Sequence, residues 1–401
     1  MISHGAIVPL IGGLPLGAEL AFGSKPKFVL SYSPFKANDS QFLAYHNDTL
    51  PYYIIDEEKK PIVSRLSKVD VVGATCPCAG LSSLSPSASS TNKNNDWMIQ
   101  SAKFVLSEVK PQVFWGENAP RLASRMGEPI VKMLRQIGDA NGYTFSLYKT
   151  KSLLHGLSQV RDRSFYFFWK EREQVPLLSF FKREHERIED TIRQSKARFD
   201  DPMSIVTNSR IPSQQPFYRY VLEEMLGGFT HQEFQQHIKH STNPMTFLEN
   251  AGIKYCDVAV WMKNNGYEKL TLRCEKIHEK LSIGQNVMRK DVEIPKDKIG
   301  AFVGHLPMML THPDIDRFIT IREALDIMKM PEDFVLQGGT KNLNMICQSV
   351  PVSTAADMSR EILKYLNGEL DMMHTRFMIQ DNKNQTYVQE TTPATLDTFV
   401  L

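Results

Sequence analysis

Two cysteines separated by a single residue are the first candidates for chemistry in this sequence. Cys76 and Cys78 lie in the stretch "ATCPCAGLSSLSP" (74–86), directly after the apolar run "VDVVG". One intervening residue is too few for the usual zinc or thioredoxin spacing, and no second cysteine or histidine pair completes a site, so we expect no metal. The stretch alone leaves two interpretations open: two buried hydrophobic thiols, or a nucleophile at Cys78.

Polar residues also accompany two later runs of strand length. Glu117 lies near the end of "VKPQVFWGEN" (109–118), and Gln159, Arg161 and Arg163 lead into the aromatic run "RSFYFFW" (163–169). Loops at strand ends of open α/β sheets often carry their chemistry. On its own, however, Glu117 is typical of a solvated acid, and the two arginines are typical of a salt-bridged surface pair.

The elements that would position these residues alternate between strands and helices. Strands are predicted over 27–32, 70–75, 109–118 and 163–169, and a helix over 129–142. This alternation predicts an α/β fold with a mostly parallel sheet over residues 1–174. Residues 175–311 carry charged helical runs without the alternation, so we expect a second domain there. Residues 312–366 return to the first domain, and 367–401 are predicted to form a polar C-terminal tail.

Composition sets further limits. A length of 401 residues is typical of two domains, and a net charge of +2 means that any nucleic-acid-binding surface must be a local patch. No apolar run is long enough to cross a membrane, and the N-terminus lacks the basic leader of a signal peptide. Five thinly spread cysteines favour a reducing compartment. We expect a monomeric, cytoplasmic protein.

Four stretches, taken in order, resemble the cytosine-5 DNA methyltransferase family. They are "PCAGLS" (77–82), "ENAP" (117–120), "HGLSQVRDRSFYFF" (155–168) and "FITIREALDIMKMPEDF" (318–334). They are similar to that family's Pro-Cys nucleophile loop, Glu-Asn-Val element, Gln-x-Arg-x-Arg strand and threonine-arginine-glutamate helix. The resemblance covers residues 1–174 and 312–366. It implies a Rossmann-like methyltransferase fold with a smaller target recognition domain over 175–311.

The resemblance also implies a mechanism. Cys78 would add to ring carbon 6 of a cytosine flipped out of double-stranded DNA, which makes carbon 5 nucleophilic toward a one-carbon donor. Glu117 would donate a proton at ring nitrogen 3, and Arg163 would bind the ring carbonyl. Arg161 and Gln159 would support the loop and a phosphate. With Cys78 in place, these roles outweigh the surface interpretations of the same residues.

The same resemblance assigns three supporting parts. Cys76 is expected to be a packing residue, because the family needs one thiol. The serine-rich stretch after Cys78 corresponds to a mobile catalytic loop. The polar residues of 175–311 would contact phosphates and base edges of the DNA.

The donor that the resemblance implies is S-adenosylmethionine. Its candidate binding residues are Gly12, Gly13, Tyr32, Asp56, Pro77 and Gln348. This half departs from the family, because Leu10 replaces a glycine of the first turn and Tyr32 replaces the acid that would bind the ribose hydroxyls. Three hypotheses remain: an S-adenosylmethionine-dependent methyltransferase, a cytosine-5 hydroxymethyltransferase using 5,10-methylenetetrahydrofolate, and a catalytically inactive DNA-binding paralogue.

Overall fold

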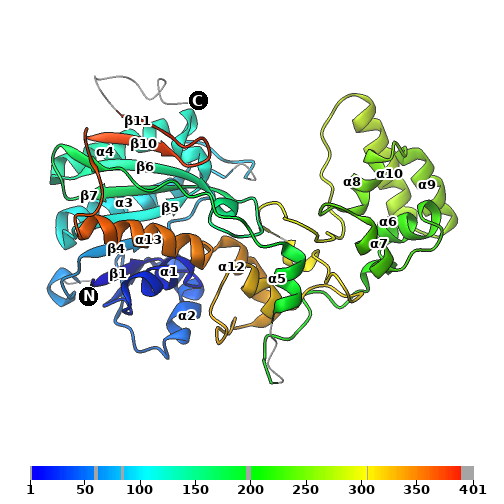
Figure 1. The fold of residues 1–401 in the computed structure, drawn as a ribbon, viewed down its shortest axis with the longest axis horizontal. Helices are drawn as coiled ribbons and strands as arrows, with labels where there is room; N and C mark the ends of the chain where they lie inside the picture. Colours follow the sequence, from blue (N-terminus) through cyan, green and yellow to red (C-terminus); the bar gives the residue numbers. More distant parts are fainter. Residues whose placement is uncertain (1, 58–61, 83–84, 196–199, 305, 390–401) are drawn as a thin grey trace. The chain divides into compact units, whose positions relative to one another are not determined.

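The computed structural model describes residues 2–57, 62–82, 85–195, 200–304 and 306–389. The chain divides into two compact units, which are described separately (Figure 1). The first unit consists of Met1–His185, Met328–Gln337 and Gln348–Leu401. The second consists of Glu186–Ile327 and Gly338–Cys347.

Within the described residues, the first unit contains one nine-stranded sheet, with the order β11-β10-β6-β7-β5-β4-β1-β2-β3. Its strands are β1 (His4–Ile7), β2 (Val29–Ser31), β3 (Tyr52–Ile54), β4 (Val71–Ala74), β5 (Val113–Asn118), β6 (Thr144–Lys151), β7 (Asp162–Trp169), β10 (Phe377–Asp381) and β11 (Thr386–Gln389). Neighbours from β3 to β5 run parallel, whereas β7 is antiparallel to both β5 and β6. The predicted α/β fold with a mostly parallel sheet is confirmed.

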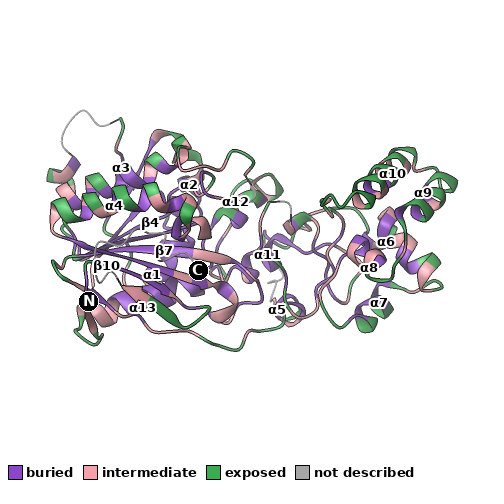
Figure 2. Cartoon of the chain, turned by 90° about the horizontal axis from the view of Figure 1, so that it is seen from above, coloured by how far each residue is buried: buried purple, intermediate pink, exposed green. Residues whose placement is uncertain are grey.

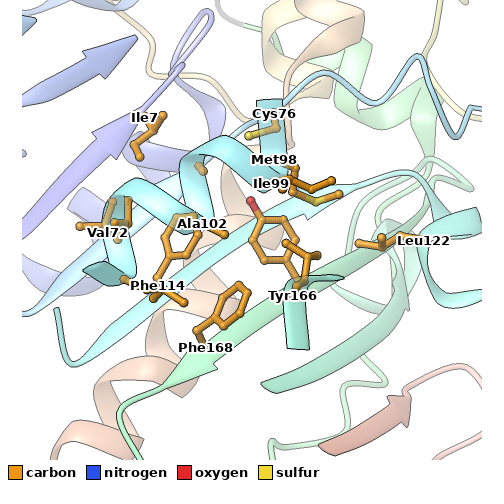
Figure 3. Close-up of a cluster of buried hydrophobic side chains, with 14 of the residues drawn as sticks. Ile7, Val72, Cys76, Met98, Ile99, Ala102, Phe114, Leu122, Tyr166 and Phe168 are labelled. Carbon is orange, nitrogen blue, oxygen red and sulfur yellow. The ribbon is translucent and has the colours of Figure 1, made fainter. Parts of the chain in front are cut away.

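Helices cover both faces of this sheet (Figure 2). One face packs against α1 (Gly13–Phe22) and α13 (Val352–Leu366), and the other against α3 (Asp96–Phe104) and α4 (Glu128–Asn141). Successive strand side chains point to opposite faces, so a strand covered on both sides must be apolar at every position. The second half of β7 follows this rule: Phe167 and Trp169 face α1 and α13. Tyr166 and Phe168 face α3 and α4 (Figure 3).

The prediction of a C-terminal tail over 367–401 is wrong for residues 372–389. Strand β9 (Met372–His374) pairs with β8 (Gln174–Pro176), and β10 pairs in parallel with β6. Phe377 and Met378 are fully buried on opposite faces of the sheet, which explains why this short run joins the core. Residues 390–401 lie outside the described part of the chain.

The role of β10 can be tested by stability measurements. Phe377 is fully buried, stacks on Phe145 and carries the Arg135 guanidinium 4.3 Å from its ring centre. Phe377→Ala should lower the free energy of unfolding by about 3–5 kcal/mol, because it leaves a cavity in the core. Tyr387→Ala on β11, where the side chain is 42% exposed, is the control and should change it by about 0.5 kcal/mol or less. If the two variants have equal urea midpoints, Phe377 does not contribute to the core and the original prediction of a C-terminal tail is restored.

The second unit is helical where it is described. It contains α5 (Ile188–Gln194), α6 (Pro216–Tyr220), α7 (His231–His237), α8 (Pro244–Asn250), α9 (Tyr255–Asn264), α10 (Glu268–Ser282), α11 (Ile321–Ile327) and most of α12 (Leu343–Gln348). Side chains from α6 to α10 share one hydrophobic cluster, centred on residues such as Tyr218, Met245 and Val258. The return to the first unit was expected at 312 but occurs at Met328, so α11 belongs to the second unit. Among the described residues, no helix is both long and apolar enough to cross a bilayer.

Candidate active site

A cavity of about 440 Å³ lies at the carboxyl ends of the central parallel strands of the first unit. Its lining includes residues 75–79 after β4, Ser82 and Ser85, and Glu117 of β5. It also includes Leu10, Phe35, Asn38 and Gln348, and we call these four residues the donor side. Its volume falls in the range of small-molecule sites. The topology therefore brings Cys78 and Glu117 into one site, although 39 residues separate them in the sequence.

The two neighbouring cysteines occupy different environments. Cys76 is 2% exposed and packs in the core with Met98 and Tyr166, and its Sγ lies 3.7 Å from Ser101 Oγ (Figure 3). Burial raises the pKa of the Cys76 thiol to about 11. Cys78 is half-buried at the cavity wall. The core position of Cys76 agrees with a packing role.

Opposing charges surround the Cys78 thiol. Burial raises its pKa above the usual value, the Glu117 carboxylate raises it further, and Arg163 and Arg161 lower it. Burial, the largest of these causes, favours the neutral thiol. Loss of the Glu117 charge would remove one of the two causes that raise this pKa; burial would still favour the thiol, and the two arginines would still favour the thiolate.

Glu117 and Arg163 form a buried ion pair through Oε1 and Nε, with side chains that are 3% and 13% exposed. Strand pairing explains it: Glu117 lies opposite Phe165, so Arg163 is its diagonal neighbour on the same face of β5 and β7. Glu117 is therefore not a solvated acid, and Arg163 is not part of an exposed surface pair. The two groups expected to bind a cytosine ring contact each other in the absence of the ring.

Arg161 and Gln159 contact neighbouring segments of the chain with their buried side chains. Arg161 is 1% exposed and donates a hydrogen bond of 2.9 Å to the Ser349 carbonyl, and the Gln159 amide lies 3.3 Å from Met328 Sδ. Both side chains are buried, so the structure contradicts the expected phosphate contact. Their contacts with Ser349 and Met328 are compatible with the expected supporting role.

The predicted glycines of the donor site have structural roles. Gly12 has a φ of +105°, and a side chain there would collide with Phe42. A side chain at Gly13 would collide with the Val350 carbonyl, and the Gly13 N–H donates to Ser349 Oγ at 3.1 Å. Both glycines lie outside the described lining of the cavity. They allow close packing of the turn before α1, and their role in donor binding stays a prediction.

Tyr32 also differs from its predicted position. It is 2% exposed, its hydroxyl lies 3.0 Å from Ser101 Oγ, and its ring packs 4.7 Å from that of Trp97. It therefore points into the core and does not stand in for the ribose-binding acid. Asp56, just after β3, is exposed and accepts a hydrogen bond of 2.9 Å from the Ser33 N–H. Of the predicted donor residues, Pro77 and Gln348 line the cavity.

Several cavity residues were missed from the sequence, among them Leu10, Phe35 and Asn38. Leu10 was treated only as a departure from a glycine pattern, yet its side chain lines the cavity. Phe35 and Asn38 follow β2 directly, which is the signal that could have found them. Phe35 is held edge-on against Trp97, with ring centres 5.4 Å apart.

The described part of the serine-rich loop is anchored to α3. The Asn95 amide donates to the Ser89 and Ser90 carbonyls at 3.0 and 3.3 Å, and Leu81 is fully buried. Residues 83–84 lie outside the described chain. Mobility of this loop stays a prediction.

Comparisons with known proteins show the family and the fold. Residues 11–364 match the family model for C-5 cytosine-specific DNA methylase. The type II methyltransferase M.Bpa9945I of Bacillus paralicheniformis is 23% identical, over 76% of this chain and 72% of that protein. Two solved structures share the fold: Entamoeba histolytica methyltransferase EhMeth (TM-score 0.55, 11% identity, 91% of this chain and 99% of that one) and S. pombe Dnmt2 (TM-score 0.51, 12% identity, 91% and 99%).

Proposed function

Because the chain belongs to the C-5 cytosine-specific DNA methylase family, we propose that it transfers a one-carbon group to carbon 5 of cytosine in double-stranded DNA, with Cys78 as nucleophile. The observation that carries this proposal is that Cys78 and Glu117 line the same cavity. Arg163, which pairs with Glu117, completes a set of groups for one cytosine ring. The base must leave the duplex to reach these groups.

The charges around Cys78 suggest how the chain activates the base. Transfer of the thiol proton to Glu117, directly or through water, produces a thiolate and a carboxylic acid at once. The acid loses its pairing with Arg163 and can donate its proton to ring nitrogen 3, while Arg163 binds the ring carbonyl. Addition of the thiolate to carbon 6 then makes carbon 5 nucleophilic. Carbon 5 then takes the one-carbon group from the donor, whose leaving group departs with the electron pair of the broken bond. Water, acting as base, removes the proton of carbon 5, the thiolate leaves carbon 6, and ring nitrogen 3 returns its proton to the Glu117 carboxylate, which restores the ring.

The family typically uses S-adenosylmethionine, but the donor side of this cavity does not fit the family's manner of binding it. Among the described lining residues, Glu117 is the sole carboxylate, and it pairs with Arg163. No acid in this lining is therefore left for ribose hydroxyls, and Leu10 occupies the wall. A cytosine-5 hydroxymethyltransferase using 5,10-methylenetetrahydrofolate is thus the second candidate. The intact set of Cys78, Glu117 and Arg163 argues against a non-catalytic paralogue.

Mass spectrometry of nucleosides tests the proposal. Duplex DNA is incubated with the protein and either S-adenosylmethionine or 5,10-methylenetetrahydrofolate, then digested. We expect 5-methylcytosine with the first donor or 5-hydroxymethylcytosine with the second. DNA binding without a modified cytosine from either donor would contradict the proposal.

We propose that DNA binding uses a surface of α10 in the second unit. Lys269, Arg273, Lys276 and Lys280 follow one another at helical spacing on one face and line a groove of about 520 Å³, here called the cationic groove. None of the described lining residues is acidic. The row of four cationic residues is about 16 Å long. Along one strand of DNA, successive phosphates are spaced ~3.4 Å apart along the helix axis. Charge and length therefore suit a DNA backbone.

The salt dependence of binding tests the cationic groove. Changing Lys269, Lys276 and Lys280 together to alanine should weaken binding. It should also flatten the slope of log K against log salt by about 0.9 for each phosphate that the variant no longer neutralises. Arg273 is left in place because it donates to the Lys290 carbonyl at 3.1 Å. Binding is measured by fluorescence anisotropy over a range of salt concentrations.

Lys263→Ala provides the matched control, because this exposed lysine of α9 lies outside the described lining of the groove. Its slope should equal that of the wild type. A triple variant with an unchanged slope would exclude the groove as the phosphate-binding surface.

A further inference from the structure

Leu10 adopts a backbone conformation that leucine rarely adopts. Its φ is +55°, in the left-handed region, where a Cβ atom crowds the following carbonyl. Such residues persist only where their surroundings hold them, and they cluster at functional sites. The Leu10 side chain is 8% exposed and forms part of the cavity wall. The strain is therefore located where it sets the shape of the donor side.

A buried carboxylate holds Leu10 in this conformation. The Leu10 N–H donates to Asp39 Oδ1 at 3.0 Å, while Ser31 Oγ and the Tyr52 hydroxyl donate to Oδ2. Asp39 is fully buried, and burial raises its pKa to about 7. Its three partners come from the turn after β1, from β2 and from β3. Asp39 thus links the turn that contains Leu10 to two neighbouring strands, β2 and β3.

Val8 provides an internal comparison. It has a φ of +48° in the same turn, but it is fully buried and lies outside the described lining of the cavity. The turn therefore contains two strained positions, and only one of them, Leu10, projects a side chain into the candidate donor site.

We propose that Leu10, held by Asp39, is a specificity-determining residue that narrows the donor side of the cavity against S-adenosylmethionine. The inference rests on the proposed function of this cavity as the transfer site. The branched side chain occupies space that a backbone alone would leave to the donor. The wall that remains is apolar at Leu10 and Phe35 and neutral at the amides of Asn38 and Gln348. It suits a donor that offers a flat or apolar surface and needs no carboxylate partner.

Calorimetry with S-adenosylmethionine and with its demethylated product tests the role of Leu10. Leu10→Gly should bind both at least about tenfold more tightly than the wild type, because it opens the wall. Val8→Gly should leave both affinities unchanged. Glycine relieves the strain of a positive φ, but each variant also loses a buried apolar side chain, so both should unfold at a lower temperature than the wild type. A single cooperative thermal transition above the assay temperature checks that each variant is folded.

Two results would overturn the inference. If Leu10→Gly binds no more tightly than the wild type, the side chain does not restrict the site. If Val8→Gly tightens binding as much as Leu10→Gly, relaxation of the turn is the cause. Both outcomes concern binding to the free protein. They are thus separate from a failure of the proposed function, which would appear as absence of modified cytosine with any donor.

Discussion

Cys78→Ala should abolish formation of modified cytosine in duplex DNA. We expect a loss of at least about 10,000-fold, on the scale seen when a covalent nucleophile is removed, because nothing else would activate carbon 5. The product is quantified by nucleoside mass spectrometry with whichever donor supports the wild type. DNA binding should be retained, since the half-buried thiol lies in the first unit and the cationic groove in the second.

Cys76→Ala is the matched control. Its thiol is buried against Ser101 and Tyr166, so the variant should lose some stability but keep part of the activity. DNA containing 5-fluorocytosine separates the two thiols further. Fluorine replaces the proton that must leave carbon 5, so the thioether should persist on a denaturing gel for the wild type and Cys76→Ala. A trapped Cys78→Ala protein together with an untrapped Cys76→Ala protein would show that the nucleophile was assigned to the wrong cysteine.

The position of Cys78 and Glu117 in one cavity could be predicted because both residues lie near strand ends. Cys78 follows β4 and Glu117 ends β5, and neighbouring parallel strands bring their carboxyl ends to one edge. The motif order then identified which polar residues belong together. The direct Glu117–Arg163 ion pair was not expected, because it depends on the register of β5 and β7, which local sequence does not specify.

At the residues predicted to bind the donor, the position in the sequence did not indicate which way the side chain points. Tyr32 lies at the predicted place after β2, but its side chain turns into the core, and the direction of one side chain depends on the packing around it. Asp39 reads locally as an acid in the first turn of α2 (Lys36–Tyr45), a position that favours negative charge for any helix. Its burial beneath Leu10 arises from partners that lie up to 29 residues away.

The C-terminal strands were missed for a related reason. The pairing of β10 with β6 joins Phe377 to Phe145, and such long-range pairing leaves little local signal in a five-residue strand. The periodic pattern of apolar residues identifies long, regular elements most readily. A short buried strand within a polar segment is therefore easily taken for a tail.

Glu117→Gln should slow turnover by about 100- to 10,000-fold while DNA binding is retained. Glutamine keeps the size of the side chain but cannot donate the proton that ring nitrogen 3 requires. The same change should make the thiol more reactive, because the Glu117 charge raises the pKa of Cys78 whereas Arg163 and Arg161 lower it. Removing that charge should therefore lower the pKa and increase the thiolate fraction at pH 7.

Turnover and thiol reactivity should thus change in opposite directions. Alkylation of Cys78 by iodoacetamide, followed by peptide mass spectrometry across pH 6–9, reports the thiolate directly. Cys256, which is exposed, provides an internal reference in each sample. Loss of folding would expose the buried Cys76 to alkylation as well, so fragment ions that place a label on Cys76 within the shared peptide report on integrity. Faster alkylation of Cys78 with slower turnover would separate the role of Glu117 as proton donor from its effect on the thiol. Unchanged turnover would remove it from the mechanism.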